Sequence, residues 1–307
     1  MSSLETEEER QFRTFANYLA SVELLLEVEH TSCEGLVSSL RSAMQPQRKL
    51  ATGVNLDDVL NLLKRAWATE ALMNLPFKLD AMKDIVPQAV LWLPVQTYYA
   101  VFSALDAALR SHGHIVDTHS KALRSYATQL RGQMPFPLNC ACVGPDDSYV
   151  YENFRCNPDK NFSTLKRPQS VDDAQHLLGT ALRSTRRHLL DDRCDDWKRK
   201  AKKKRILAAQ RKQIGTLEAA TSLLHFLYRL RLRSNYGDSD VFVSGSTARE
   251  SIAFARAYVN VTSYFLGSLE CLIEKRLGTG YIGSAIKQLN RNPGTLRPVE
   301  NRWTLQT

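Results

Sequence analysis

The sequence lacks an apolar run of about 18 residues, the length that a membrane-spanning helix needs. Glycine (14) and proline (11) are scarce among the 307 residues, which favours long helices over many tight turns. The acidic, polar start, MSSLETEEERQF, differs from a secretory signal, and six scattered cysteines are typical of thiols in a reducing compartment. We therefore expect a cytoplasmic protein that does not enter a membrane.

Several motifs of enzyme and metal chemistry are also missing. The chain has no Walker A loop, no Gly-x-Gly-x-x-Gly and no Gly-x-Ser-x-Gly, so nucleotide-dependent and serine-hydrolase chemistry have no support. Cys140-Ala-Cys142 has no histidine nearby, and His112-Gly-His114 has few carboxylates beside it. Both spacings match a zinc site poorly. We expect neither a metal nor a cofactor.

Apolar residues recur at steps of three and four over four long stretches, which is the period of an amphipathic helix. These stretches are 5–30, 94–110, 214–233 and 247–278. The second, PVQTYYAVFSALDAALR, is apolar on most sides, which is typical of a helix buried among others. Thr247-x-x-Glu250 forms a capping box, and Gly278 suits the end of the same helix. The sequence therefore predicts an all-α bundle.

The predicted bundle is divided along the chain. Residues 1–132 supply its N-terminal helices, and residues 214–282 supply its C-terminal helices. Between them, 133–213 is predicted as a partly irregular insertion, because prolines interrupt it. A small β-hairpin around Gly144-Pro145 and then a basic helix are expected within this insertion. Residues 283–307 are polar, and we expect a loosely attached tail there.

One segment carries the excess positive charge of the chain. Between Arg183 and Lys212 there are thirteen Lys and Arg and four Asp, an excess of nine that equals the formal charge of the whole sequence, +9. Its densest part, KRKAKKKR at 198–205 (the basic arm), is stable only in solvent or against an anion. Nucleic-acid phosphates are the expected anion. The alternatives are a solvated helix face and, in a eukaryotic cell, a nuclear localisation signal.

Two segments carry a resemblance to a known family. VQTYYAVF at 95–102 and YRLRLRSNYGD at 228–238 are similar to the core helix and the signature-helix end of the HEPN superfamily, helical proteins of prokaryotic defence and toxin–antitoxin systems. The similarity covers about 85–130 and 214–278. It implies metal-independent RNA cleavage at a composite site in a homodimer, with RNA as a partner. A partner protein from the same module is a further implication.

The resemblance includes one departure. In active HEPN proteins the signature is Arg, four to six residues, then His, often followed at the second position by Tyr. If Arg229 is the motif Arg and Tyr236 the motif Tyr, the His position falls on Ser234. Asn235 also fits the spacing, but it cannot exchange a proton near neutral pH as histidine does. The chain is then either a non-catalytic HEPN-like protein or one that uses another base.

His188 is the one histidine with an arginine five to seven residues upstream, Arg183. Together with Arg186 and Arg187, it supplies the base and the cations that cleavage through a 2′-hydroxyl needs. The alternative is a surface histidine in a basic helix.

The sequence thus predicts two groups of functional residues. The candidate catalytic group is Arg229, Arg233, Asn235, Tyr236 and His188. The candidate nucleic-acid-binding group is Arg183, Arg187, Lys198, Arg199, Lys200, Lys202, Lys203, Lys204, Arg205 and Arg231. The i and i+4 spacing of Arg229 and Arg233 fits either a phosphate clamp or a plain solvent face. One hypothesis is an RNA-engaging protein, a ribonuclease of a bacterial defence or toxin–antitoxin module; the other is a non-catalytic subunit that dimerises or binds a partner protein while its basic arm contacts nucleic acid.

Overall fold

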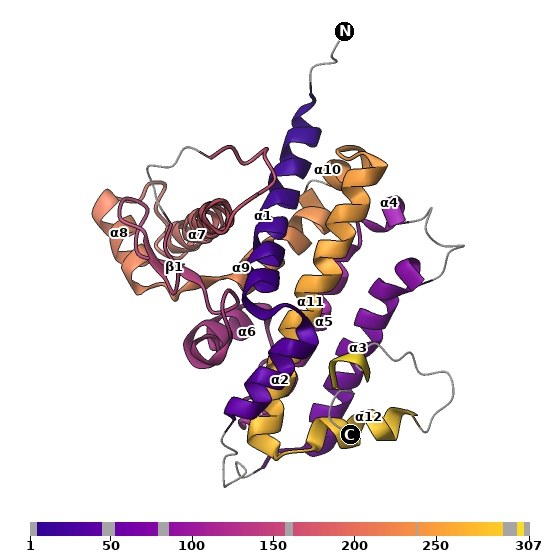
Figure 1. Ribbon diagram of the computed structural model, residues 1–307. Helices are drawn as coiled ribbons and strands as arrows, with labels where there is room; N and C mark the ends of the chain where they lie inside the picture. Colours follow the sequence, from indigo (N-terminus) through magenta and orange to yellow (C-terminus); the bar gives the residue numbers. More distant parts are fainter. Residues whose placement is uncertain are drawn as a thin grey trace.

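The computed structural model describes residues 5–44, 53–78, 86–156, 162–237, 239–290 and 300–303. Four long helices run through the body of the molecule (Figure 1): α1 (Glu7–His30), α3 (Leu56–Lys78), α5 (Leu93–Ser111) and α11 (Ala248–Leu277). A fifth long helix, α7 (Val171–Lys200), packs against α1 and is seen almost end-on in Figure 1. The predicted all-α class is confirmed at this level.

Shorter elements complete the described chain. The helices are α2 (Cys33–Ala43), α4 (Val86–Ala89), α6 (His119–Ser125), α8 (Ala208–Leu217), α9 (Leu223–Leu232), α10 (Ser239–Ser244), α12 (Tyr281–Asn290) and α13 (Glu300–Trp303), with the short turns η2 (Tyr126–Leu130), η3 (Arg131–Gln133) and η4 (Arg233–Gly237). The strands β1 (Ala141–Val143), β2 (Val150–Glu152) and β3 (Thr221–Ser222) form one antiparallel sheet in the order β2-β1-β3. Within the described part, no helix has the length and apolar content that a membrane crossing requires.

Local signals determine where the long helices begin and end. The Thr247 hydroxyl accepts a hydrogen bond from the backbone of Glu250, whose carboxylate accepts one from the Thr247 N–H, so the predicted capping box is confirmed. The same motif starts α1 at Thr6, and Ser170 caps α7. Each cap of this kind stabilises a helix by about 1 kcal/mol. Gly278 ends α11 with a φ of 110°, a conformation that favours glycine.

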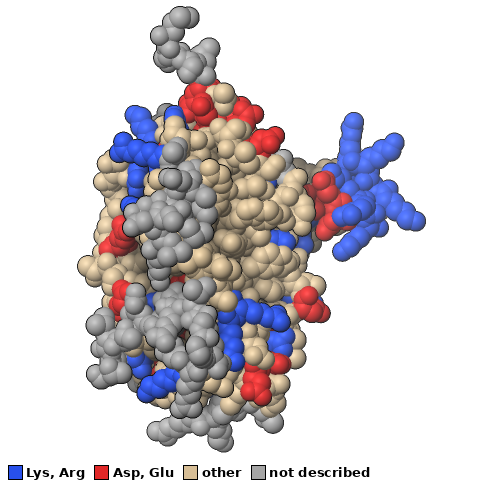
Figure 2. All heavy atoms as spheres, turned by 90° about the vertical axis from the view of Figure 1, so that its right-hand side faces the viewer, with Lys and Arg blue, Asp and Glu red and all other residues tan. Residues whose placement is uncertain are grey.

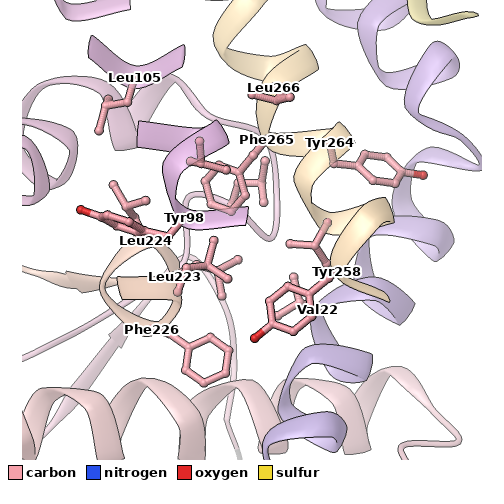
Figure 3. Packing of buried hydrophobic residues seen from close by; sticks show 14 of the residues in the cluster. Val22, Tyr98, Leu105, Leu223, Leu224, Phe226, Tyr258, Tyr264, Phe265 and Leu266 are labelled. Atoms are coloured by element: carbon pink, nitrogen blue, oxygen red, sulfur yellow. The ribbon is translucent and has the colours of Figure 1, made fainter. Parts of the chain in front are cut away.

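The core gathers apolar side chains from helices far apart in the sequence. Figure 3 shows Val22 of α1, Tyr98 of α5, Phe226 of α9 and Phe265 of α11 around one space, and each side chain is fully buried. Leu178 of α7 belongs to the same apolar cluster. The segment predicted as an insertion therefore supplies one of the helices of the bundle, and the predicted division between 132 and 214 does not separate it from the core.

Arg186 of α7 holds the region around the small sheet together. Its side chain is fully buried, and burial lowers its pKa. The guanidinium donates to the carbonyls of Gly144 (2.9 Å), Gly215 (2.8 Å), Glu218 (3.3 Å) and Ala219 (2.6 Å) and to the hydroxyl of Thr221 (3.2 Å). These acceptors belong to the hairpin turn, to the end of α8 and to β3. One side chain thus joins three segments to α7.

The sheet explains where one predicted helix is wrong. The predicted hairpin is confirmed as β1 and β2, but the helix predicted over 214–233 is interrupted. The chain leaves α8 at Leu217, pairs with β1 through β3, and begins α9 at Leu223. Arg186 donates hydrogen bonds to two backbone carbonyl groups in this break. Tertiary hydrogen bonds therefore override a continuous helical period.

The prediction of a loosely attached tail over 283–307 is wrong for the part that is described. α12 extends into it, and Arg302 of α13 is 5% exposed. The Arg302 guanidinium pairs with Glu70 and with Glu270 (Nη2 to Oε1, 2.8 Å), and both carboxylates are buried. Trp303 Nε1 also donates to Glu270 (2.7 Å). The rest of the predicted tail, beyond α12 and α13, lies outside the described residues.

Replacing Arg302 by alanine is expected to lower the free energy of unfolding by about 3–5 kcal/mol, because two buried carboxylates lose their cation. Urea denaturation followed by circular dichroism measures the change. Arg249→Ala removes an exposed arginine and should change stability by less than about 0.5 kcal/mol. If Arg302→Ala has an equally small effect, α13 contributes nothing to the core. Adding Glu70→Gln to Arg302→Ala should restore part of the loss.

Candidate nucleic-acid interface

α9 and the turn that follows it distribute three arginines over two sides of the bundle. Arg229 and Arg233 are four residues apart and share one face. Arg229 Nη1 donates to the hydroxyl of Ser184 on α7 (2.9 Å), whereas Arg231 Nη2 donates to the hydroxyl of Tyr99 on α5 (2.7 Å). The predicted arginine cluster is therefore divided. Two members face α7 and α1, and the third enters the space between α9 and α5.

A cleft of about 680 Å³ lies between α1, the loop at 162–165, α7 and the end of α9. Arg10, Arg229 and Arg233 line it, together with the hydroxyl groups of Thr14 and Ser184; we call it the arginine cleft. Glu7 contributes an acidic group to the same lining. Guanidinium and hydroxyl groups are the side chains that most often bind phosphate oxygens. The composition of the cleft therefore suits an anion.

Neighbouring rings help to hold these cations in the cleft. The guanidinium carbon of Arg233 lies 5.2 Å from the centre of the Phe15 ring, a cation–π contact. Burial raises the pKa of Tyr18, another lining residue, while the charges of Arg229 and Arg183 act in the opposite direction. Arg183, an exposed residue of α7, therefore also lies near the arginine cleft.

His188 lies beside the arginine cleft. It follows Ser184 by one turn of α7, so the two side chains share a face, and Ser184 contacts Arg229. Burial lowers the pKa of His188 below its ordinary value of 6.5, and the charges of Arg229 and Arg233 lower it further, although two aspartates of α7 act in the opposite direction. His188 is therefore neutral near pH 7, which is the form that accepts a proton.

The other members of this basic run point elsewhere. Burial raises the pKa of Tyr149, beside the hairpin, to about 12, and the charge of Arg187 acts against this shift. Arg187 is exposed on that side of α7, and Arg186 is buried under the sheet. The side chains of the run from Arg183 to His188 thus lie in three different places. Those of Arg183 and His188 lie near the arginine cleft.

The residues that follow α9 do not converge on the cleft. Ser234, which occupies the position of the HEPN histidine, is 3% exposed and donates to the backbone carbonyl of Leu91, just before α5. Asn235 is half-buried in η4, Tyr236 is 74% exposed, and neither is among the residues that line the cleft. Asp238, the last residue of the signature-like stretch, lies outside the described residues. The predicted catalytic group is therefore split, with the two arginines and His188 on one side.

Arg231 is enclosed by tyrosines. It is 7% exposed, and its guanidinium carbon lies 5.0 Å from the ring centre of Tyr99 and 5.6 Å from those of Tyr98 and Tyr228. Its Nε atom has no hydrogen-bond partner among the described residues. Aromatic faces stabilise the buried charge in place of a carboxylate. This burial does not fit the predicted direct contact of Arg231 with phosphate.

The basic arm continues from the end of α7. Figure 2 shows a cluster of Lys and Arg side chains that stands out from the body, with acidic side chains at its base. The helix ends in a Schellman motif: the N–H of Lys203 donates to the carbonyl of Lys198 (2.9 Å), and that of Lys202 to the carbonyl of Arg199 (3.2 Å). Lys202 has a φ of 52°, a conformation that costs a non-glycine residue about 1–2 kcal/mol.

Aspartates pair with the root of the basic arm. Lys198 pairs with Asp195 (2.5 Å), and Arg199 pairs with Asp196. Cations at the C-terminal end of α7 also complement the helix dipole. The remaining cations of the arm are exposed: Lys200, Lys202, Lys203, Lys204 and Arg205. Pairing with aspartate is thus confined, among the contacts of the described part of the arm, to Lys198 and Arg199, and the tip of the arm presents its charge to solvent.

The histidines and cysteines that the sequence groups together do not form a metal site in the described part of the chain. His112 Nδ1 lies 2.9 Å from the carbonyl of Ala108, and His119 Nδ1 lies 3.0 Å from the Tyr98 hydroxyl. All six cysteines, each in the described part, are free thiols. Among the described residues, no His, Cys, Asp and Glu side chains form a group of three that could hold a metal ion.

No family model, curated protein or solved structure matches this chain. The resemblance to the HEPN superfamily therefore stays a prediction. What the arginine cleft and the basic arm can do follows from their geometry and charge.

Sequence reasoning does not identify three residues of the arginine cleft, namely Arg10, Thr14 and Ser184. Arg10 lies in an acidic first turn, and the two hydroxyl residues belong to ordinary amphipathic helices. They meet Arg229 because α1 packs against α7 and α7 packs against α9. The i and i+4 spacing of Arg10 and Thr14 is the only local signal, and it does not distinguish them from other surface pairs.

Removing either arginine of the cleft should raise the pKa of His188. In Arg229→Ala and Arg233→Ala a positive charge near the imidazole disappears, so the protonated form becomes less unfavourable. NMR titration of the His188 ring protons measures the shift. Arg124→Ala, which removes an exposed arginine of α6, is the control and should leave the titration unchanged. An unaltered pKa in both cleft variants would show that the charges of the cleft arginines do not reach the His188 imidazole.

Proposed function

We propose that the protein engages RNA, with the arginine cleft as its binding site and the basic arm as a second, electrostatic contact. The observation that carries this proposal is the convergence of Arg10, Arg229 and Arg233 in one cleft beside a neutral His188. Arginine binds phosphate through parallel N–H donors. The cleft volume, about 680 Å³, lies in the range of about 300–1,000 Å³ that small-ligand sites occupy.

The basic arm supports the same proposal from a different direction. Its exposed cations stand clear of the body (Figure 2) and attract the phosphate backbone over several ångströms without reading its sequence. The arm would raise the rate of encounter and retain the strand. The arginine cleft would hold one phosphate at a defined place.

Neutralising the tip of the basic arm should weaken RNA binding and reduce its salt dependence. The variant replaces Lys200, Lys202, Lys204 and Arg205 by glutamine. Each phosphate contact that is lost lowers the slope of log K against log salt by about 0.7 for a single strand. Fluorescence anisotropy with labelled RNA at several salt concentrations measures both quantities.

A matched variant controls for net charge. Replacing Arg65, Lys121, Arg124 and Arg249, which are exposed elsewhere, removes the same four charges. It should leave the slope nearly unchanged, because these residues belong to α3, α6 and α11 and not to the basic arm. Equal slopes for the two variants would remove the basic arm from the interface, and no measurable RNA binding by the unaltered protein would refute the proposal.

RNA cleavage without metal is the second candidate function, and the position of His188 favours it. A neutral imidazole can take the proton of a 2′-hydroxyl, and two nearby guanidinium groups can stabilise the charge that develops on the phosphorus oxygens. This assigns the role of base to His188 of α7, in place of the signature position that Ser234 occupies. The arginines of the cleft and His188 beside it therefore supply the residue types for cleavage even though the signature histidine is absent.

If the protein cleaves RNA, the reaction should persist in EDTA. Loss of a general base lowers a rate by about 10²–10⁴-fold, so His188→Gln should retain about 1% of the activity or less. Activity should fall at acidic pH as His188 becomes protonated. Gel analysis of labelled RNA measures the rates, with His176→Gln as a matched substitution on the same helix.

Intact RNA after prolonged incubation with the unaltered protein would exclude the ribonuclease. Salt-dependent binding would then favour the alternative, a non-catalytic subunit whose bundle dimerises or binds a partner protein. The burial of Ser234 supports that alternative. A HEPN-like identity, a homodimer, a partner from a defence or toxin–antitoxin module and a cytoplasmic location belong to the proposal and follow from the resemblance.

A further inference from the structure

Exposed aromatic side chains gather at the end of the bundle where α5 begins. Trp92, just before α5, is 54% exposed, Tyr99 on α5 is 39% exposed and Tyr236 in η4 is 74% exposed. Large aromatic rings usually bury most of their surface, so three exposed ones in neighbouring elements call for a reason.

Two observations bring these residues to the same end of the bundle. Trp92 and Tyr99 are seven residues apart, two helical turns, so they lie on the same face of α5 at a separation of about 10 Å along the axis. The Ser234 hydroxyl donates to the carbonyl of Leu91, which fastens η4 to the residue before Trp92. Tyr236 follows two residues later in η4. We call Trp92, Tyr99 and Tyr236 the aromatic stripe.

A buried cation lies behind the middle of the aromatic stripe. The guanidinium carbon of Arg231 is 5.0 Å from the ring centre of Tyr99, and its Nη2 donates to the Tyr99 hydroxyl. The ring of His119 lies 6.0 Å from that of Tyr99. Burial and the charge of Arg231 lower the pKa of His119, so it adds an uncharged flat ring. Tyr99 is therefore held rigidly at the surface, with a positive charge on its inner side.

The aromatic stripe begins where the arginine cleft ends. Arg233, a cleft residue, is the first residue of η4, and Tyr236 is the fourth. A strand that places a phosphate between Arg229 and Arg233 would next pass over η4 and reach the start of α5. The positive charges of Arg229 and Arg233 suit an anionic chain whose bases are flat and apolar.

We infer that the aromatic stripe stacks the unpaired bases of a single-stranded RNA whose phosphates occupy the arginine cleft. This inference rests on the proposed function and adds a substrate class to it, single-stranded rather than duplex RNA. Every base has a π-face, so stacking of this kind tolerates any sequence, whereas paired bases in a duplex are not available to it. The stripe supplies contacts that do not depend on salt, and the cleft and arm supply those that do.

The experiment compares a labelled oligouridylate with a duplex of the same length. The full chain should bind the single strand at least tenfold more tightly. Trp92→Ala and Tyr236→Ala should each weaken binding of the single strand by about tenfold, without changing the salt slope. Binding of the duplex should not change. Leu217→Ala, which removes an exposed apolar side chain of α8, is the control and should have no effect. All three residues are exposed, and thermal melting checks that the variants remain folded.

A second readout follows the stacked ring directly. Oligouridylate should quench part of the tryptophan fluorescence, and Trp92→Phe should abolish that part while binding persists. Equal affinity for both RNAs with unchanged Trp92→Ala and Tyr236→Ala variants would overturn the inference, yet leave salt-dependent RNA binding intact. Loss of a sedimenting dimer in Trp92→Ala, with unchanged RNA affinity, would also overturn it and assign the stripe to a protein contact. Failure of all RNA binding refutes both this inference and the proposed function.

Discussion

The interaction on which the rest of the structure depends is the burial of Arg186. A guanidinium without solvent must satisfy its N–H groups inside the protein, and Arg186 does so with backbone carbonyls and one hydroxyl. These acceptors come from the hairpin turn, the end of α8 and β3, which are distant from Arg186 along the chain. Because β3 leads directly into α9, the same contact determines how α9 leaves the sheet and where Arg229 meets α7. A buried cation of this kind is costly unless its donors are satisfied, so the arrangement has few alternatives.

The arginines of this protein differ in how deeply they are buried and in what surrounds their charge. Arg302 neutralises two buried carboxylates and attaches α13 to the core. Arg231 is stabilised by tyrosine faces and fixes Tyr99 at the surface. Arg229 and Arg233 line a cleft that is open to solvent. The chemical group is the same in each case, and the surroundings decide whether its charge lies inside the fold or at an open cleft.

The charge of the chain is distributed in an equally uneven way. The excess positive charge lies between 183 and 212, and its densest part is the basic arm, which stands out from a body of mixed charge (Figure 2). A long-range field of this kind attracts polyanions without selecting among them. Contacts at short range act differently from this field. Arg229 faces α7 on one side of α9, and Arg231 faces Tyr99 of α5 on the other.

The sequence by itself determined the all-α class, the long helices α1, α5 and α11, the caps of α11 and the concentration of positive charge. These features depend on periodicity, capping residues and composition, all of which act within a few turns. Tertiary structure decided the remainder: the break between α8 and α9, the docking of Arg302, the burial of Arg231 and the position of Arg10 and Arg229 in one cleft. Each of these depends on a hydrogen bond or a packing contact between segments distant in the chain, and such contacts leave no local pattern. The arginines look alike in the sequence, and only the folded surroundings distinguish those that are buried from those that line an open cleft.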